Sequence, residues 1–129
     1  MKAAIIRETA KGERRVAATP ETVRKLAAMG VDVVVEAGAG AGAFIADADY
    51  ENAGAKIASS AAEALAGADL VLKVQAPSAE ELEAIPEGAT VVALFAPHSY
   101  PHKRKLLARR IRAFALELIP RISRAQSMD

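Results

Sequence analysis

The last ten residues, PRISRAQSMD, place a dense set of hydrogen-bonding side chains directly after an apolar run, AFALELI, which is expected to form a buried strand. Arg121 and Arg124 carry planar groups that only donate hydrogen bonds. Gln126 both donates and accepts, and Asp129 accepts. This mixture suits a primary carboxamide such as that of nicotinamide, which presents one carbonyl oxygen and one NH₂ group. The segment is the first candidate for a binding site, and an ordinary polar tail is the alternative.

Cations in or beside predicted strands are the second candidates. Lys73 interrupts the apolar run LVLKVQAP, and a buried ammonium needs a carboxylate, a carbonyl or a ligand. A lysine on an edge strand that reaches solvent explains the same pattern, and the sequence favours neither interpretation. Arg14 and Arg15 follow the first predicted strand, where an arginine can bind a carboxylate or a phosphate through two hydrogen bonds.

Two further patterns favour structural explanations. The stretch EAGAGAGAF has glycines spaced G-x-G-x-G, whereas a dinucleotide loop needs G-x-G-x-x-G leading into a helix. It is predicted to be a turn that lets backbone pack closely. The stretch HKRKLLARRIR holds six Lys and Arg residues between His102 and Arg112. It is predicted to be a helix with a solvated basic face and with Leu106, Leu107 and Ile111 turned inward.

These residues lie in a chain where short apolar runs alternate with amphipathic helical patterns, which is typical of a parallel sheet covered by helices on both faces. The pattern predicts strands at 2–8, 31–38, 55–59, 68–77, 89–97 and 112–120. It predicts helices at 21–30, 47–54, 59–68, 78–85 and 101–111. We therefore expect a single domain with a three-layer, doubly wound, mostly parallel α/β sheet of flavodoxin-like type. Such sheets bind ligands at the carboxyl ends of their strands.

Helix boundaries are marked by specific residues. Thr19 followed by Pro20 predicts a helix start, and Gly30 predicts the end of that helix. Ser60 is expected to cap a later helix. Ser78 and Glu81 have the spacing of a capping box.

Composition narrows the function. The 129 residues are 52% hydrophobic but only 4% aromatic, so the core must be built from Ala, Val, Ile and Leu. The chain has no cysteine, which excludes disulfides and thiolate chemistry, and having only two histidines, His98 and His102, argues against a histidine metal site. A net charge of +1 gives no reason to expect a nucleic-acid partner. The N-terminus lacks a signal-peptide pattern and no apolar run is long enough to span a bilayer, so we expect a cytoplasmic location.

Four stretches together resemble a known family: RVAATPETVRKL, VVVEAGAGAGAFIADADY, LVLKVQAP and, most specifically, PRISRAQSMD. They are similar to the N-terminal domain of the alpha subunit of proton-translocating NAD(P) transhydrogenase, its soluble NAD(H)-binding component and a relative of alanine dehydrogenase. The resemblance implies an oxidoreductase whose alpha subunit has two α/β domains with NAD(H) in the cleft between them. Residues 1–129 correspond to the first domain. The second, Rossmann domain, with the glycine-rich nucleotide loop, is absent from this chain.

The resemblance also implies roles for the terminal residues. Arg121, Gln126 and Asp129 surround the nicotinamide ring as cofactor-binding residues, and Gln126 and Asp129 act in catalysis by orienting the carboxamide and the ring. Hydride passes directly from NAD(H) to NADP held on a partner component, coupled to proton translocation, and no side chain serves as acid or base. A further serine of the family site falls after Asp129.

The implied partners follow from the same resemblance. They are the missing second domain, the NADP-binding and membrane components of the transhydrogenase, and a second copy of the subunit in a homodimer. The protein would then be peripheral at the inner face of the membrane through its partner subunits. The 129 residues alone are expected to bind NADH weakly or not at all and to be inactive.

Two alternatives remain open. Arg15 and Lys73 match the arginine and lysine that bind the substrate carboxylate in alanine dehydrogenases, which implies half of an NAD-dependent amino acid oxidoreductase. The catalytic histidine of that family falls at Ala96, with His98 displaced from the position. The other alternative is a non-catalytic binding module that uses the basic helix 102–112.

Overall fold

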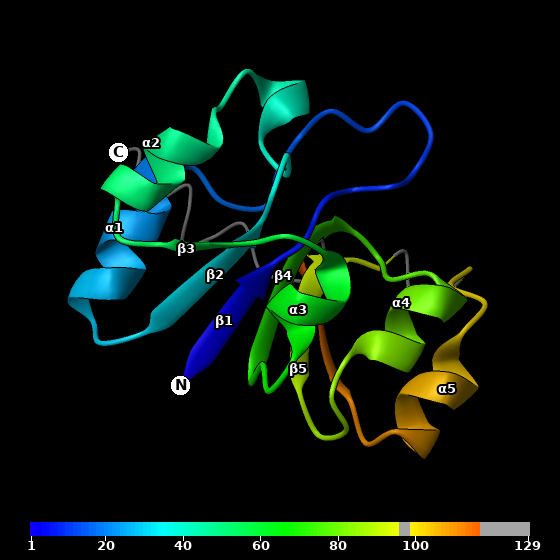
Figure 1. Cartoon of the computed structure of the whole chain (residues 1–129). Helices are drawn as coiled ribbons and strands as arrows, with labels where there is room; N and C mark the ends of the chain where they lie inside the picture. Colours follow the sequence, from blue (N-terminus) through cyan, green and yellow to red (C-terminus); the bar gives the residue numbers. More distant parts are fainter. Residues whose placement is uncertain (96–98, 117–129) are drawn as a thin grey trace, which may run out of the picture.

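The structure is a computed structural model that describes residues 1–95 and 99–116. Six strands form one sheet in the order β3-β2-β1-β4-β5-β6, and every pair of neighbours is parallel (Figure 1). The strands are β1 (Lys2–Ile5), β2 (Asp32–Glu36), β3 (Lys56–Ala58), β4 (Leu70–Gln75), β5 (Thr90–Leu94) and β6 (Arg112–Ala115). The strand β3 has three residues and lies at the edge. Over all six strands this is the order 3-2-1-4-5-6 of doubly wound parallel sheets. Without the edge strand β3 it becomes the flavodoxin-like order 2-1-3-4-5, so the predicted doubly wound fold is confirmed.

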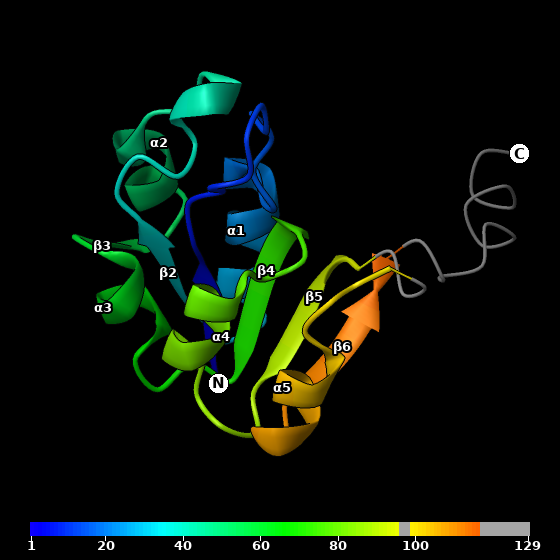
Figure 2. The same ribbon diagram turned by 90° about the vertical axis from the view of Figure 1, so that its right-hand side faces the viewer.

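The helices lie on both faces of this sheet. They are α1 (Pro20–Ala28), α2 (Asp47–Asn52), α3 (Ala61–Leu65), α4 (Ala79–Ala84) and α5 (Lys103–Ala108), with a 3-10 turn η1 (Ala41–Ala43) after β2. Helices α1 and α2 pack on one face, where Val23 and Tyr50 meet Ile5 and Val35. Helices α3, α4 and α5 pack on the other face (Figures 1 and 2). The connections β1–α1–β2 and β2–α2–β3 run one way along the sheet, and the chain then returns to build β4, β5 and β6.

The predicted helix caps are confirmed. The Thr19 side chain accepts a hydrogen bond from the Thr22 amide, and Pro20 is the first helical residue. The Ser78 hydroxyl accepts from the Glu81 amide while the Glu81 carboxylate accepts from the Ser78 amide, which is the reciprocal capping box. Local chemistry alone therefore sets where these helices begin.

Two expectations about burial are wrong. Leu107 does not face inward but is 79% exposed, because it is next to the inward-facing Leu106 and a helix turns by about 100° per residue. The last strand is not buried, since β6 is the edge strand and Phe114 is 57% exposed. An edge strand has a partner on one side only, and no helix of the described residues covers the face that carries Phe114.

The loops after β1 and β2, at the carboxyl edge of the sheet, are in direct contact. The buried Tyr50 hydroxyl donates to the Ala18 carbonyl at 2.7 Å, which ties α2 to the loop after β1. A Cβ on Gly42 would lie 2.9 Å from the Arg14 carbonyl oxygen, so the loop after β2 packs directly on the backbone of the loop after β1. The predicted role of the glycine stretch in close backbone packing is confirmed.

Candidate functional site

Lys73 is buried on a central strand of the sheet. It is on β4, between β1 and β5, and is 2% exposed, so the edge-strand interpretation is wrong. Its ammonium nitrogen lies 3.2 Å from Glu8 Oε1 and 3.2 Å from Glu81 Oε2. Both carboxylates are themselves nearly buried, with side-chain exposures of 3% and 14%. The need of a buried ammonium for carboxylate partners, inferred from the sequence, is met by two of them.

Glu8 makes further contacts from the loop after β1. Its carboxylate accepts hydrogen bonds from the Val74 amide at 2.9 Å and from the Gln75 amide at 3.1 Å. Charged acceptors form the stronger class of hydrogen bond. The carboxylate therefore binds the end of β4 through the backbone as well as through Lys73.

Arg15 belongs to a second, more exposed cluster at the same edge. Its guanidinium binds both oxygens of Glu13, through Nη2 at 2.8 Å and Nε at 3.0 Å, and Gln75 Nε2 donates to Glu13 at 2.8 Å. The hydrogen bonds from Arg15 and then from Gln75 lower the pKa of Glu13 to about 2. The same contact with Glu13 raises the pKa of Arg15. The structure thus brings Arg15 and Lys73 to one edge, but each is bound to a carboxylate of the protein.

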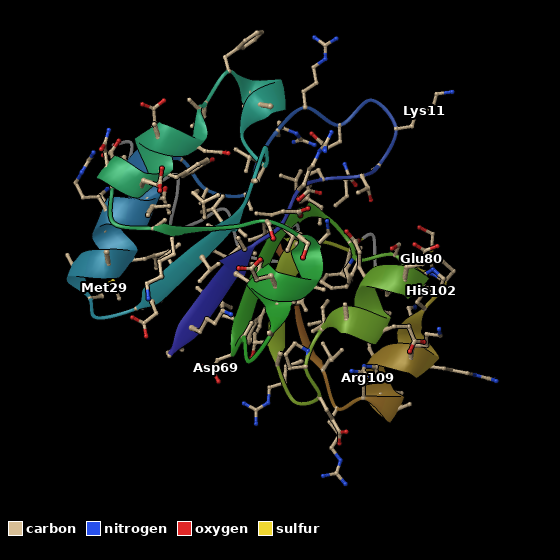
Figure 3. All side chains as sticks on the ribbon, viewed as in Figure 1. Lys11, Met29, Asp69, Glu80, His102 and Arg109 are labelled. Atoms are coloured by element: carbon tan, nitrogen blue, oxygen red, sulfur yellow. The ribbon has the colours of Figure 1, made fainter. Side chains whose placement is uncertain are left out.

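Cavities open beside both clusters. One of about 600 Å³ lies between the loop after β1 and the helices α3 and α4, and its lining includes Arg7, Glu8, Glu36 and Glu81. A smaller one of about 130 Å³ lies between the loop after β1 and the glycine stretch. Figure 3 marks this edge by Lys11, at the tip of the loop after β1, and the opposite edge by Asp69. The carboxyl edge therefore carries the recesses that a doubly wound sheet is expected to use.

Several predicted site residues lie outside the described residues. They are the three terminal candidates and the two positions compared with the dehydrogenase histidine: Arg121, Gln126, Asp129, Ala96 and His98. The nicotinamide-binding hypothesis for the terminal segment therefore stays a prediction from sequence.

The basic helix is partly neutralised by acids that the sequence places far away. Lys105 pairs with Glu83 at 2.7 Å, and Arg110 lies 3.9 Å from Glu87. Arg109 is partly buried and donates to the Ile85 carbonyl, which ends α4 (Figure 3). The solvated-face interpretation accounts for this helix.

Sequence reasoning missed the carboxylates that organise the edge. Glu8 and Glu13 had no predicted role, and Glu81 was predicted only as part of a helix cap, although each lies at or shortly after a predicted strand end. A usable signal was available: a lysine in a buried strand requires acids, and the loops after neighbouring strands are where those acids can reach it. The hydrogen bond from the buried Tyr50 hydroxyl to the Ala18 carbonyl was not predicted either.

Two absences hold for residues 1–95 and 99–116. No group of three or more histidine or acidic side chains there is placed to hold a metal ion. None of the helices in this part of the chain is long and apolar enough to cross a membrane.

Comparison with known proteins gives consistent results. The family model described as "Alanine dehydrogenase/PNT, N-terminal domain" matches residues 4–129. The chain is 50% identical over 135 aligned residues to an NAD(P) transhydrogenase alpha subunit protein of Rhodospirillum rubrum, covering 100% of this chain and 35% of that protein. It is 42% identical to the transhydrogenase subunit alpha of Haemophilus influenzae, covering 95% of this chain and 24% of that one. The alanine dehydrogenase of Halomonas elongata is 44% identical over 70% of this chain and 24% of its own length.

Among solved structures, a transhydrogenase is again more similar to this chain than an alanine dehydrogenase is. The transhydrogenase from Sinorhizobium meliloti superposes with a TM-score of 0.91 at 45% identity, covering 100% of this chain and 39% of that chain. An L-alanine dehydrogenase superposes with a TM-score of 0.83 at 29% identity, covering 89% of this chain and 32% of its own. The chain thus spans 24–39% of the length of these relatives. It belongs to the family of alanine dehydrogenase and transhydrogenase N-terminal domains.

Proposed function

We propose that this chain acts as the first domain of the NAD(H)-binding component of an NAD(P) transhydrogenase. The observation that carries the proposal is the extent of the similarity. Transhydrogenase alpha subunits match 95–100% of the chain, whereas the alanine dehydrogenases match 63–70% of it by sequence. In this function a second domain supplies the glycine-rich nucleotide loop, and partner components hold NADP and span the membrane. A homodimer, a coupled proton movement and a peripheral location at the inner membrane face belong to the same proposal.

The terminal segment is proposed to hold the nicotinamide. The donor set of Arg121, Gln126 and Asp129 suits a carboxamide, because it offers donors to the carbonyl oxygen and acceptors to the NH₂ group. The bound dinucleotide supplies the hydride. The side chains orient the carboxamide and ring and provide electrostatic stabilisation, so no acid or base is required.

A fusion to the remainder of the Rhodospirillum rubrum subunit tests this function. Supplied with the NADP-binding component, the fusion should transfer hydride from NADH to an oxidised NADP analogue. Gln126→Ala should slow the transfer at least about tenfold while the thermal stability of the domain is unchanged, since misplacing a ring costs rate steeply. Lys11→Ala, at an exposed loop tip, is the matched control and should leave the rate unchanged. An unaltered rate in the Gln126 variant would contradict the assignment.

The second candidate function is half of an alanine-dehydrogenase-like enzyme. It is favoured by the location of Arg15 and Lys73 at one sheet edge, and opposed by their pairing with Glu13, Glu8 and Glu81. A fusion of this chain to the second domain of the Halomonas elongata enzyme should oxidise NADH with pyruvate and ammonium if this candidate is right. Absence of that turnover, with hydride transfer to the NADP analogue, favours the first function.

A further inference from the structure

Glu8 connects the loop after β1 to the end of β4 at the carboxyl edge of the sheet. It belongs to the loop after β1, yet its carboxylate contacts the Lys73 ammonium and the backbone amides of Val74 and Gln75 on β4. The side chain is 3% exposed. Contacts of a buried charged acceptor with an ammonium and two amides leave the carboxylate little freedom to rotate.

The pairing of β4 with its two neighbours is irregular near its end, where Glu8 binds. On one side, β1 pairs with β4 only as far as Ile5 and Leu72. On the other side, the register with β5 shifts after Leu72, and the pairing resumes only at Gln75 with Leu94. Amides in an irregular strand end must find partners outside the ladder. Glu8 supplies acceptors for two of these amides.

Gln75 extends this arrangement to the second cluster. Its backbone amide donates to Glu8, and its side-chain nitrogen donates to Glu13 at 2.8 Å. Glu13 in turn holds the Arg15 guanidinium through both of its oxygens. A continuous row of hydrogen bonds therefore runs from Lys73 through Glu8, Gln75 and Glu13 to Arg15.

We propose that Glu8 is a positioning residue that fixes Lys73 and Arg15 relative to one another at the carboxyl edge. Glu81 cannot do the same. It contacts the Lys73 ammonium and the Ser78 amide at the start of α4, whereas the Val74 and Gln75 amides of β4 bind Glu8. The role concerns the geometry that any ligand at this edge would meet. It therefore stands apart from the proposed hydride transfer and is tested without it.

The test compares Glu8→Gln with Glu81→Gln in the full 129-residue chain. Both variants remove one carboxylate charge 3.2 Å from the same ammonium. NMR would follow hydrogen exchange at the Val74 and Gln75 amides and the order parameter of the Arg15 Nε–H bond. In Glu8→Gln, exchange at the two amides should rise about tenfold, and the Arg15 order parameter should fall below about 0.6, the flexible range. In Glu81→Gln, both should stay as in the unmodified chain.

A second variant covers the case in which Glu8→Gln does not fold. Gln75→Ala keeps the backbone bonds to Glu8 and removes only the side-chain link to Glu13. The Arg15 order parameter should fall, while exchange at Val74 stays unchanged. An unmoved Arg15 in Gln75→Ala, or equal responses to the Glu8 and Glu81 variants, overturns the proposal.

Discussion

The two halves of the sheet differ in how they are covered. Strands β1, β2 and β3 have helices on both faces, with α1 and α2 on one side and α3 on the other. Strands β4, β5 and β6 have α4 and α5 on one face (Figures 1 and 2). On the opposite face, Val92 pairs with Phe114, and within residues 1–95 and 99–116 no helix packs over this pair. Ile5 in the first half is fully buried, and Phe114 is 57% exposed.

This difference shows that apolar sequence does not by itself give burial. The runs that become β2 and β6 read alike, since both are short, apolar and follow a helix. Their surroundings depend on where the connecting helices pass. The first two crossover helices, α1 and α2, lie on one face of the sheet and cover β1, β2 and β3. The later helices α3, α4 and α5 all lie on the other face. All-parallel sheets normally have both faces covered by helices. Within the described residues, the half formed by β4, β5 and β6 is therefore the less fully covered one.

The largest expected effect comes from shortening a buried side chain in the half of the sheet that helices cover on both faces. Ile5→Ala should lower the free energy of unfolding by about 2–5 kcal/mol, the usual cost of such a truncation in a packed core. Leu72→Ala, next to Ile5 in register but only half-buried, should cost less. Urea unfolding followed by circular dichroism measures both. Equal costs would mean that the boundary between the halves does not lie at β4.

Removing one hydroxyl from each half should give intermediate effects. Tyr50→Phe leaves the buried Ala18 carbonyl without its partner and should cost about 1–3 kcal/mol. Tyr100→Phe removes a bond of the same 2.7 Å length, to the Pro77 carbonyl, in a half-buried setting. Its cost should be nearer to about 1 kcal/mol, because water can replace the lost partner. A larger loss for Tyr100 would contradict the comparison.

The two tyrosines also predict a pH dependence. Burial, and then the nearby Asp47 for Tyr50 and Glu81 for Tyr100, raises the pKa of each phenol to about 12. Because the folded pKa lies above the ordinary value of 10.0, their contribution to stability is complete below pH 10 and is lost as the pH rises through 12. Absorbance of the phenolate should therefore appear near pH 12 in the folded chain and near pH 10 in urea. Titration of either tyrosine near pH 10 in the folded chain would show that its surroundings are open to water.

The smallest effect is expected at the uncovered face. Phe114→Ser should change the free energy of unfolding by less than about 1 kcal/mol, whereas a fully buried phenylalanine costs about 3–5 kcal/mol when truncated. Thermal unfolding of the variant, with Ile5→Ala as reference, measures the difference. A cost in the buried range would show that the face is covered in solution.

The sequence alone determined the local features of this protein. Helix starts are fixed at Thr19, whose side chain accepts from a backbone amide three residues on, and at Ser78, which forms a reciprocal capping box with Glu81. Pro20 supports the first of these starts because its φ already suits the first helical turn. The apolar period fixed the number and order of elements along the chain, and hence the parallel sheet. The family followed from short motifs, with no reference to three-dimensional contacts.

Tertiary structure decided what depends on distant partners. The strand order placed Lys73 on a central strand, and its partners are Glu8, 65 residues earlier, and Glu81 in the following helix. The exposure of Leu107 and Phe114 depended on which face each helix covers. Sequence periodicity describes one element at a time, whereas burial and charge pairing are properties of elements brought together by the fold.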